Sequence, residues 1–138
     1  MPPEEEERPR AINLGHSVCI MRTDGIVFVQ CVDTYYGKKE CEQITRAIGE
    51  LSGDKRVPVL IVGSHYSSID KEGRDFSASA EGSRFSSAEA YIIKSMAQKI
   101  LANFYLKMNR PVVPSRFFKE IKEGEEWLHS LTANEKKS

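Results

Sequence analysis

A short loop carries the residue types that could perform acid–base or nucleophilic chemistry. It follows the apolar run 57–62 and contains His65, Tyr66, Ser67, Ser68, Asp70 and Lys71. A histidine can act as a base, a serine hydroxyl as a nucleophile and a carboxylate as the group that orients the base. Catalysis requires these groups within hydrogen-bond reach of one another and beside an oxyanion site, and adjacency in sequence provides neither. The chain also has no Gly-x-Ser-x-Gly motif. We therefore expect no enzyme activity and no catalytic residue, and interpret the Ser and Asp side chains as caps of a helix that begins near Asp70.

The cysteines and the remaining histidines provide no metal-binding pattern. Cys19, Cys31 and Cys41 are odd in number and lack a Cys-x-x-Cys spacing, which argues against both a disulfide framework and a zinc site. His16 and His129 lie far apart along the chain, and no histidine pair has ligand spacing. The sequence therefore predicts free, buried thiols and neither a metal nor another cofactor.

The elements around the loop indicate an α/β domain. Val57–Val62 is almost wholly apolar and is typical of a strand buried on both faces. In open α/β sheets, ligands and partners bind beyond the carboxyl ends of such strands, so we interpret 63–72 as a candidate partner-binding loop. A helix over 41–51 is predicted before this strand by apolar residues at helical spacing. A parallel strand–helix–strand crossover follows from that order.

The amino-terminal part of the domain predicts a β-hairpin. The runs 12–22 and 26–32 are rich in β-branched and aromatic residues, and Asp24-Gly25 between them is a turn signal. A two-residue turn would pair Ile20 with Val29. Near the other end, Pro114 within 112–118 and Pro111 just before it predict an edge strand, and the spacing of apolar residues predicts a last helix over 121–131.

The longest predicted helix runs from Ser86 to about Met108. Ser86 and Glu89 have the spacing of a capping box, and Asn109-Arg110-Pro111 would end the helix. Its apolar residues occupy more sides than contact with one sheet requires. The surplus is carried by Leu101, Tyr105 and Met108, which predict either a homodimer contact or the wall of a pocket. We interpret Lys94, Lys99 and Lys107 as a solvated face, because Glu81 and Glu89 are close in sequence.

Length and composition predict one domain over 11–132. An acidic segment over 1–10 is expected to be disordered and residues 133–138 to form a flexible tail. The chain has 20 basic and 20 acidic residues and no obvious basic face, which argues against a nucleic-acid partner. Because the apolar stretches are far too short for a membrane span and the amino terminus is acidic, we predict a cytoplasmic protein with no membrane partner.

Several short motifs resemble one family. They are Asp24-Gly25-Ile26, Val59-Leu60-Ile61-Val62, Arg74, Ala90-Tyr91-Ile92-Ile93-Lys94-Ser95, the stretch 103–111 and Glu126-Trp127-Leu128. With the order of elements, they are similar to the STAS domain of sulphate-transporter tails and anti-sigma-factor antagonists. More specifically, they resemble an uncharacterised family of small bacterial STAS-like (SpoIIAA-like) proteins. The resemblance covers Ile12 to Leu131 and implies a mixed sheet of four to five strands with an amino-terminal hairpin, packed against helices.

The resemblance also carries an expectation about regulation. The antagonists have an Asp-Ser-Ser-Gly sequence in which the first serine is phosphorylated by a partner kinase, and the similar stretch here is Asp70-Lys71-Glu72-Gly73. Lys71 has no hydroxyl to receive a phosphoryl group, so the usual switch is not expected. Phosphorylation of Ser67 or Ser68, near Lys71, stays open as an alternative.

Two functional hypotheses follow. The favoured one is a noncatalytic protein-interaction or regulatory module that forms a homodimer through the long helix and binds a regulatory protein at the loop 63–72. The alternative is a small-molecule or lipid-binding protein with a pocket between the sheet and the long helix.

Overall fold

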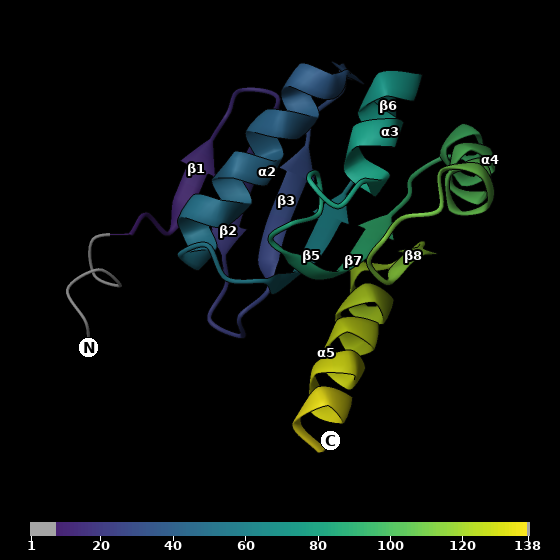
Figure 1. Cartoon of the computed structure of the whole chain (residues 1–138). Coiled ribbons are helices and arrows are strands. Elements are labelled where there is room, and N and C mark those ends of the chain that lie inside the picture. Colours follow the sequence, from purple (N-terminus) through teal and green to yellow (C-terminus); the bar gives the residue numbers. More distant parts are fainter. Residues whose placement is uncertain (1–7, 138) are drawn as a thin grey trace.

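The computed structural model describes residues 8–137, with side chains over 8–133, and places a mixed six-stranded sheet between helices (Figure 1). Its strands, in their order across the sheet, are β1 (Ala11–Asn13), β2 (Ser17–Met21), β3 (Val27–Cys31), β5 (Val57–Val62), β7 (Ser86–Ile92) and β8 (Ser115–Phe118). The first three pair antiparallel, and β3, β5, β7 and β8 pair parallel. A separate two-stranded sheet joins β4 (Tyr35–Tyr36) to β6 (Ser68–Ile69). Most of the predicted disordered segment 1–10 lies outside the described residues.

Helices cover both faces of the sheet. They are α2 (Lys38–Ser52), α3 (Lys71–Ala78), α4 (Met96–Phe104) with the π-helical turn η1 (Tyr105–Asn109), and α5 (Ile121–Lys137). α2 packs on one face and α5 on the other, each above its own buried cluster. Alternate residues of β5 serve the two clusters, Val59 on the α2 side and Leu60 on the α5 side. The predictions of a strand buried on both faces and of a parallel β3–β5 crossover are therefore confirmed.

The hairpin prediction was right in kind and wrong in register. Arg22 N donates to Ile26 O, so the loop has three residues, and Gly25 adopts φ +88°, which favours glycine. As a result Ile20 pairs with Phe28 rather than with Val29. The predicted first strand is also divided, because the chain turns at Gly15 and β1 folds back on β2.

The long helix predicted from Ser86 was wrong in its first half. Residues 86–92 form β7, which lies between β5 and β8, and α4 begins only after Ser95, whose Oγ accepts from Gln98 N. Alanine and glutamate favour helices, but burial in a sheet outweighed that local preference. The pair with capping-box spacing instead bonds within the strand, since Ser86 Oγ donates to Glu89 Oε2 over 2.8 Å. The sheet consequently has six strands rather than four or five.

Of the remaining elements, α2, α3, β8 and α5 agree with the sequence predictions except at their ends, whereas β4 and β6 were not predicted. Asp70 caps α3, and β8 lies at the sheet edge. Residues 133–137, predicted as a tail, continue α5. None of the helices within residues 8–137 has the length and apolar character needed to cross a membrane.

Candidate functional site

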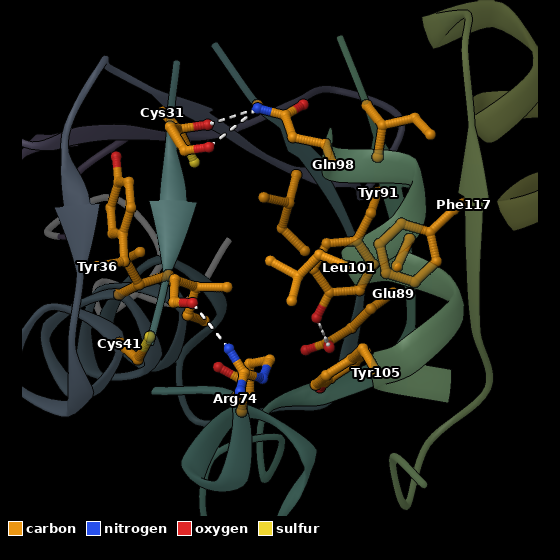
Figure 2. Close-up of a pocket in the computed structure, with 18 of the residues that line it drawn as sticks. Cys31, Tyr36, Cys41, Arg74, Glu89, Tyr91, Gln98, Leu101, Tyr105 and Phe117 are labelled. Atoms are coloured by element: carbon orange, nitrogen blue, oxygen red, sulfur yellow. Dashed lines mark hydrogen bonds between the residues drawn. The ribbon is translucent and has the colours of Figure 1, made fainter. Parts of the chain in front are cut away.

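A cavity of about 190 Å³ lies on the α2 side of the sheet (Figure 2). Strands β5, β7 and β8 form its floor, and its walls come from α2, α3, the loop 63–69 and the α4–η1 segment. Most of the lining side chains are apolar, among them Ile44, Ile48, Ile61 and Leu101. A largely apolar hollow with a few polar groups is the usual form of a small-molecule site.

An aromatic group closes one end of the cavity. The parallel register places Tyr91 beside Phe117, and their rings stack at 4.8 Å with an interplanar angle of 18°. Tyr105 of η1 contacts both rings edge-on, at centroid distances of 6.1 Å and 6.2 Å. These contacts link β7, β8 and η1 and give this end a defined shape.

Glu89 lies at the same end and is almost completely buried, with 6% of its surface exposed. Its Oε2 accepts from Ser86 Oγ, and its Oε1 accepts from the Tyr91 hydroxyl over 2.6 Å. Burial raises the pKa of Glu89 because the ionised form loses its hydration, although both hydrogen bonds act in the opposite direction. Burial also raises the pKa of Tyr91 and of Tyr105. A buried acid with a raised pKa in a cavity is a common feature of binding and catalytic sites.

Arg74 contributes a cation to the wall from α3. Its Nη1 donates to Ile69 O over 2.9 Å (Figure 2). Its guanidinium also lies over the Phe104 ring, 5.5 Å from the ring centroid. Neither Arg74 Nε nor the Tyr105 hydroxyl has a hydrogen-bond partner among residues 8–133, although both atoms are buried. Such unpaired groups are uncommon in folded proteins.

Gln98 fastens α4 to the loop that follows β5. Its Nε2 donates to Ser64 O over 2.7 Å and to Ser67 O over 3.0 Å. Its Oε1 accepts from Lys94 N. One side chain therefore holds the cavity wall formed by α4 against the wall formed by the loop.

The structure divides the loop residues singled out by sequence. Ser67 and Ser68 line the cavity. His65 and Tyr66 are exposed and pack against each other edge-on at 4.6 Å. Asp70 Oδ1 accepts from Gly73 N as the α3 cap, and Lys71 pairs with Asp75 on the surface. The stretch that resembles the phosphorylation motif is thus the first turn of α3.

The three residues of the predicted helix surface are also separated. Leu101 and Tyr105 line the cavity, whereas Met108 is 61% exposed. In a regular α-helix, Met108 would lie on the same side as Leu101, two turns further along. The wider π-helical turn of η1 over 105–109 contains Met108 and changes the direction of its side chain.

Sequence reasoning missed Glu89, Tyr91 and Phe117, and it cited Arg74 only for the resemblance. A signal was present, because Glu89 is the one charged residue in the buried stretch 86–92. With a strand period of two residues, Glu89 and Tyr91 would have been placed on one face together.

The thiols provide no reactive group. The described residues contain only free cysteines, and Cys31 and Cys41 line the cavity. Burial raises the pKa of Cys41 to about 11 and that of Cys19 to about 12, so both stay protonated and weakly nucleophilic at neutral pH. Over the same part of the chain, no group of three His, Cys, Asp or Glu side chains is arranged to hold a metal ion.

Comparison with known proteins shows the fold and the family. The chain is similar to a crystal structure of an uncharacterised protein from the DUF3478 family with a SpoIIAA-like fold, from Shewanella loihica PV-4. The TM-score is 0.55 and the sequence identity is 15%, over 81% of this chain and 91% of that chain. This similarity confirms the predicted SpoIIAA-like fold and says nothing about function. No curated protein matches the sequence. A family model described as a domain of unknown function, DUF7793, matches residues 20–132, and the chain therefore belongs to the DUF7793 family.

Proposed function

We propose that this protein is a noncatalytic module that binds a small, mainly apolar molecule in the cavity between the sheet and α4. The observation that carries the proposal is the cavity of about 190 Å³ itself. Protein interiors are packed densely and leave few voids larger than a water molecule. An open hollow lined by Ile44, Ile61 and Leu101 is therefore best explained by a molecule that fills it.

The volume limits the size of the molecule. An apolar cavity of about 150 Å³ in another protein holds benzene. By that measure a cavity of about 190 Å³ accommodates one ring or a short aliphatic chain, with any remainder extending through the opening. A polar group on the ligand would face the end where Glu89, Tyr91 and Arg74 lie.

We propose a noncatalytic function because Ser67, Asp70 and His65 each contact groups that could not act with them in catalysis. Ser67 Oγ donates to Ser64 O, and Asp70 Oδ1 accepts from Gly73 N. The His65 ring packs against Tyr66 on the surface. Each group thus has a structural role, and none of these contacts forms a nucleophile–base pair.

Binding is tested by filling the cavity from one wall. Leu101→Trp adds bulk to a lining residue, and Leu106→Trp makes the same change at a position 38% exposed on η1 and outside the lining. Hexanol and benzyl alcohol are the probes, and the readouts are calorimetry and the rise in Tm that binding to the folded state produces. Wild type and Leu106→Trp should bind and Leu101→Trp should not. Equal behaviour of the two variants, or no binding by wild type, would contradict the proposal.

Binding of another protein is a second candidate function, because Tyr35 and Tyr66 are exposed on neighbouring loops. Tyr66 is 75% and Tyr35 63% exposed, and Tyr66 N donates to Asp33 Oδ1 over 2.9 Å, which holds the two loops together. Exposed tyrosines are enriched in protein contacts. This surface contains the predicted partner loop at His65 and Tyr66. Of the three residues predicted to form a homodimer contact on the long helix, Leu101 and Tyr105 line the cavity and only Met108 is exposed.

If the bound protein is a second copy of this chain, the interaction can be tested with the purified protein alone. Sedimentation velocity over a range of concentrations would detect a homodimer. A double variant, Tyr35→Ala with Tyr66→Ala, should convert it to a monomer if these loops form the contact. A wild-type protein that stays monomeric at high micromolar concentration would remove the homodimer.

A further inference from the structure

The outer face of α4 and η1 is apolar and exposed. Met96 is 69%, Ile100 65%, Phe104 47% and Met108 61% exposed, and their spacing of four residues places them along one side. We call these four residues the α4 stripe. The opposite side of the helix, with Leu101 and the buried Tyr105, lines the cavity. Within residues 8–133, the α4 stripe therefore faces solvent on a helix that already buries its other apolar side.

The charged residues of the segment that carries the α4 stripe are all basic. From residue 90 to residue 119 the sequence has six basic and no acidic residues, and the six are Lys94, Lys99, Lys107, Arg110, Arg116 and Lys119. All six are exposed. Because the whole chain has no net charge, the rest of the molecule carries an equal excess of acidic residues. The sequence interpretation that Glu89 balances the lysines was wrong, since Glu89 is buried in β7.

The acidic residue that contacts this segment from α3 is already paired. Asp75 of α3 accepts from Asn109 of η1 and forms an ion pair with Lys71 over 2.7 Å. Lys99 and Lys107 are on the same helical segment as the α4 stripe, and no ion pair joins either of them to a residue in 8–133. The segment thus presents apolar side chains beside uncompensated positive charge.

We propose that this surface docks onto an anionic membrane, with α4 lying in the plane of the interface and the α4 stripe inserted at the boundary between headgroups and acyl chains. Helices that bind membranes in this way combine an apolar side with lysines and arginines beside it. Anionic lipids attract the basic residues, and salt screens that attraction.

Two other occupants fit the surface less well. A second copy placed symmetrically would bring Lys99 and Lys107 against the same residues of its partner, and like charges repel. Interfaces between proteins are enriched in aromatic residues, Met and Arg and depleted in lysine. The Met and Phe side chains of the α4 stripe would suit a protein or a membrane, so the exposed lysines beside the stripe are what favour an anionic membrane over a protein partner.

The proposal revises one expectation from the sequence, which was that the protein has no membrane partner. That expectation rested on the lack of a stretch long enough to span a bilayer, and a helix lying in the interface needs no such stretch. The proposal stands on exposure and charge at α4 and does not depend on whether the cavity binds a ligand. The two do share α4, so docking would place the cavity wall against a source of apolar molecules.

Co-sedimentation with vesicles tests the proposal. The full chain is mixed with vesicles of equimolar phosphatidylglycerol and phosphatidylcholine, and with vesicles of phosphatidylcholine alone. Met96→Gln with Ile100→Gln removes apolar insertion, and Lys99→Gln with Lys107→Gln removes charge. Lys55→Gln with Lys122→Gln is the matched control, because both lysines are exposed elsewhere and the net charge changes equally. Circular dichroism confirms that each variant is folded.

We expect the wild type and the control to bind the anionic vesicles, and added salt to weaken that binding. Each lysine removed at α4 should weaken binding about fivefold. The Met96→Gln, Ile100→Gln variant should bind less than wild type at every salt concentration. The proposal is overturned if the wild type does not bind anionic vesicles, or if the control loses as much binding as the Lys99→Gln, Lys107→Gln variant. It is also overturned if Met96→Gln with Ile100→Gln converts a dimer to a monomer and leaves binding to the vesicles unchanged.

Discussion

Glu89 is the least ordinary residue of the chain, because it is an acid enclosed at the aromatic end of the cavity. The Ser86 and Tyr91 hydroxyls donate to it, but they only partly replace the water that an exposed carboxylate would bind. The pKa of Glu89 is therefore raised from its ordinary value of 4.5. At pH values between the ordinary and the raised pKa, the folded protein therefore binds more protons at Glu89 than the unfolded chain does.

This difference predicts how stability depends on pH. Above the ordinary glutamate pKa the unfolded state binds fewer protons at Glu89 than the folded state, so the free energy of unfolding falls as pH rises towards the raised pKa. Glu89→Gln cannot ionise and should lack this fall, so that its stability relative to wild type increases with pH. Urea unfolding at a series of pH values measures the difference. Glu126→Gln, at an exposed position, is the control, and curves for Glu89→Gln and wild type that stay parallel would refute the explanation.

The tyrosine hydroxyls beside Glu89 differ in their partners. Tyr105→Phe removes a buried hydroxyl that has no hydrogen-bond partner in the described structure and keeps the ring contacts with Tyr91 and Phe117. We expect it to raise the free energy of unfolding by up to about 1 kcal/mol. Tyr91→Phe removes a donor to Glu89 and should lower that free energy by about 1–3 kcal/mol. Chemical denaturation compares the two, and equal losses would show that the Tyr105 hydroxyl is paired.

Among the elements, α2 approaches its neighbours most closely at a glycine. A Cβ on Gly49 would lie 2.5 Å from Cε2 of the Phe85 ring, so a larger residue forces a shift. Gly49→Ala should therefore destabilise the protein by about 1–3 kcal/mol, although alanine favours helices by about 1 kcal/mol over glycine. Thermal unfolding measures this change. Glu50→Ala, one position along on the exposed side, should have little effect, and Phe85→Leu should restore part of the loss if the clash is the cause.

The elements that sequence predicted well are those whose local pattern and tertiary environment agree. α2 has apolar residues at helical spacing, and Val57–Val62 is apolar throughout because both of its faces are buried. The stretch 86–92 has helix-favouring residues in a strand, and only its position between β5 and β8 decides the outcome. The hairpin register was missed because Gly25 permits a three-residue loop as readily as a two-residue turn.

The candidate site was predicted only in part for the same reason. Sequence indicated the loop after β5, and its residues Ser67 and Ser68 do line the cavity. Tyr91, Phe117 and Arg74 come together through the parallel register and the packing of α3, which no local pattern contains. Glu89 was hidden by the helix interpretation of 86–108. A correct strand prediction there would have changed both the fold and the site.

At the scale of the whole molecule, the central strand joins two cores. Val59 belongs to the cluster under α2 and Leu60 to the cluster under α5, so neither cluster keeps its packing if β5 leaves the sheet. Clusters that share a strand are expected to lose their structure together. The cavity lies on the α2 side of this strand, at Ile61, and its shape therefore depends on the stability of the entire domain.

This coupling predicts a single cooperative unfolding transition. Trp127 packs against Phe118 on the α5 side and reports that core by fluorescence. Cys19, Cys31 and Cys41 belong to or pack against the clusters on the α2 side, and their reaction with a thiol reagent reports that side. In urea the two signals should have the same midpoint, because removing either helix exposes one face of β5. A lower midpoint for Trp127 fluorescence than for thiol reactivity would show that α5 detaches first and that the cavity side is stable without it.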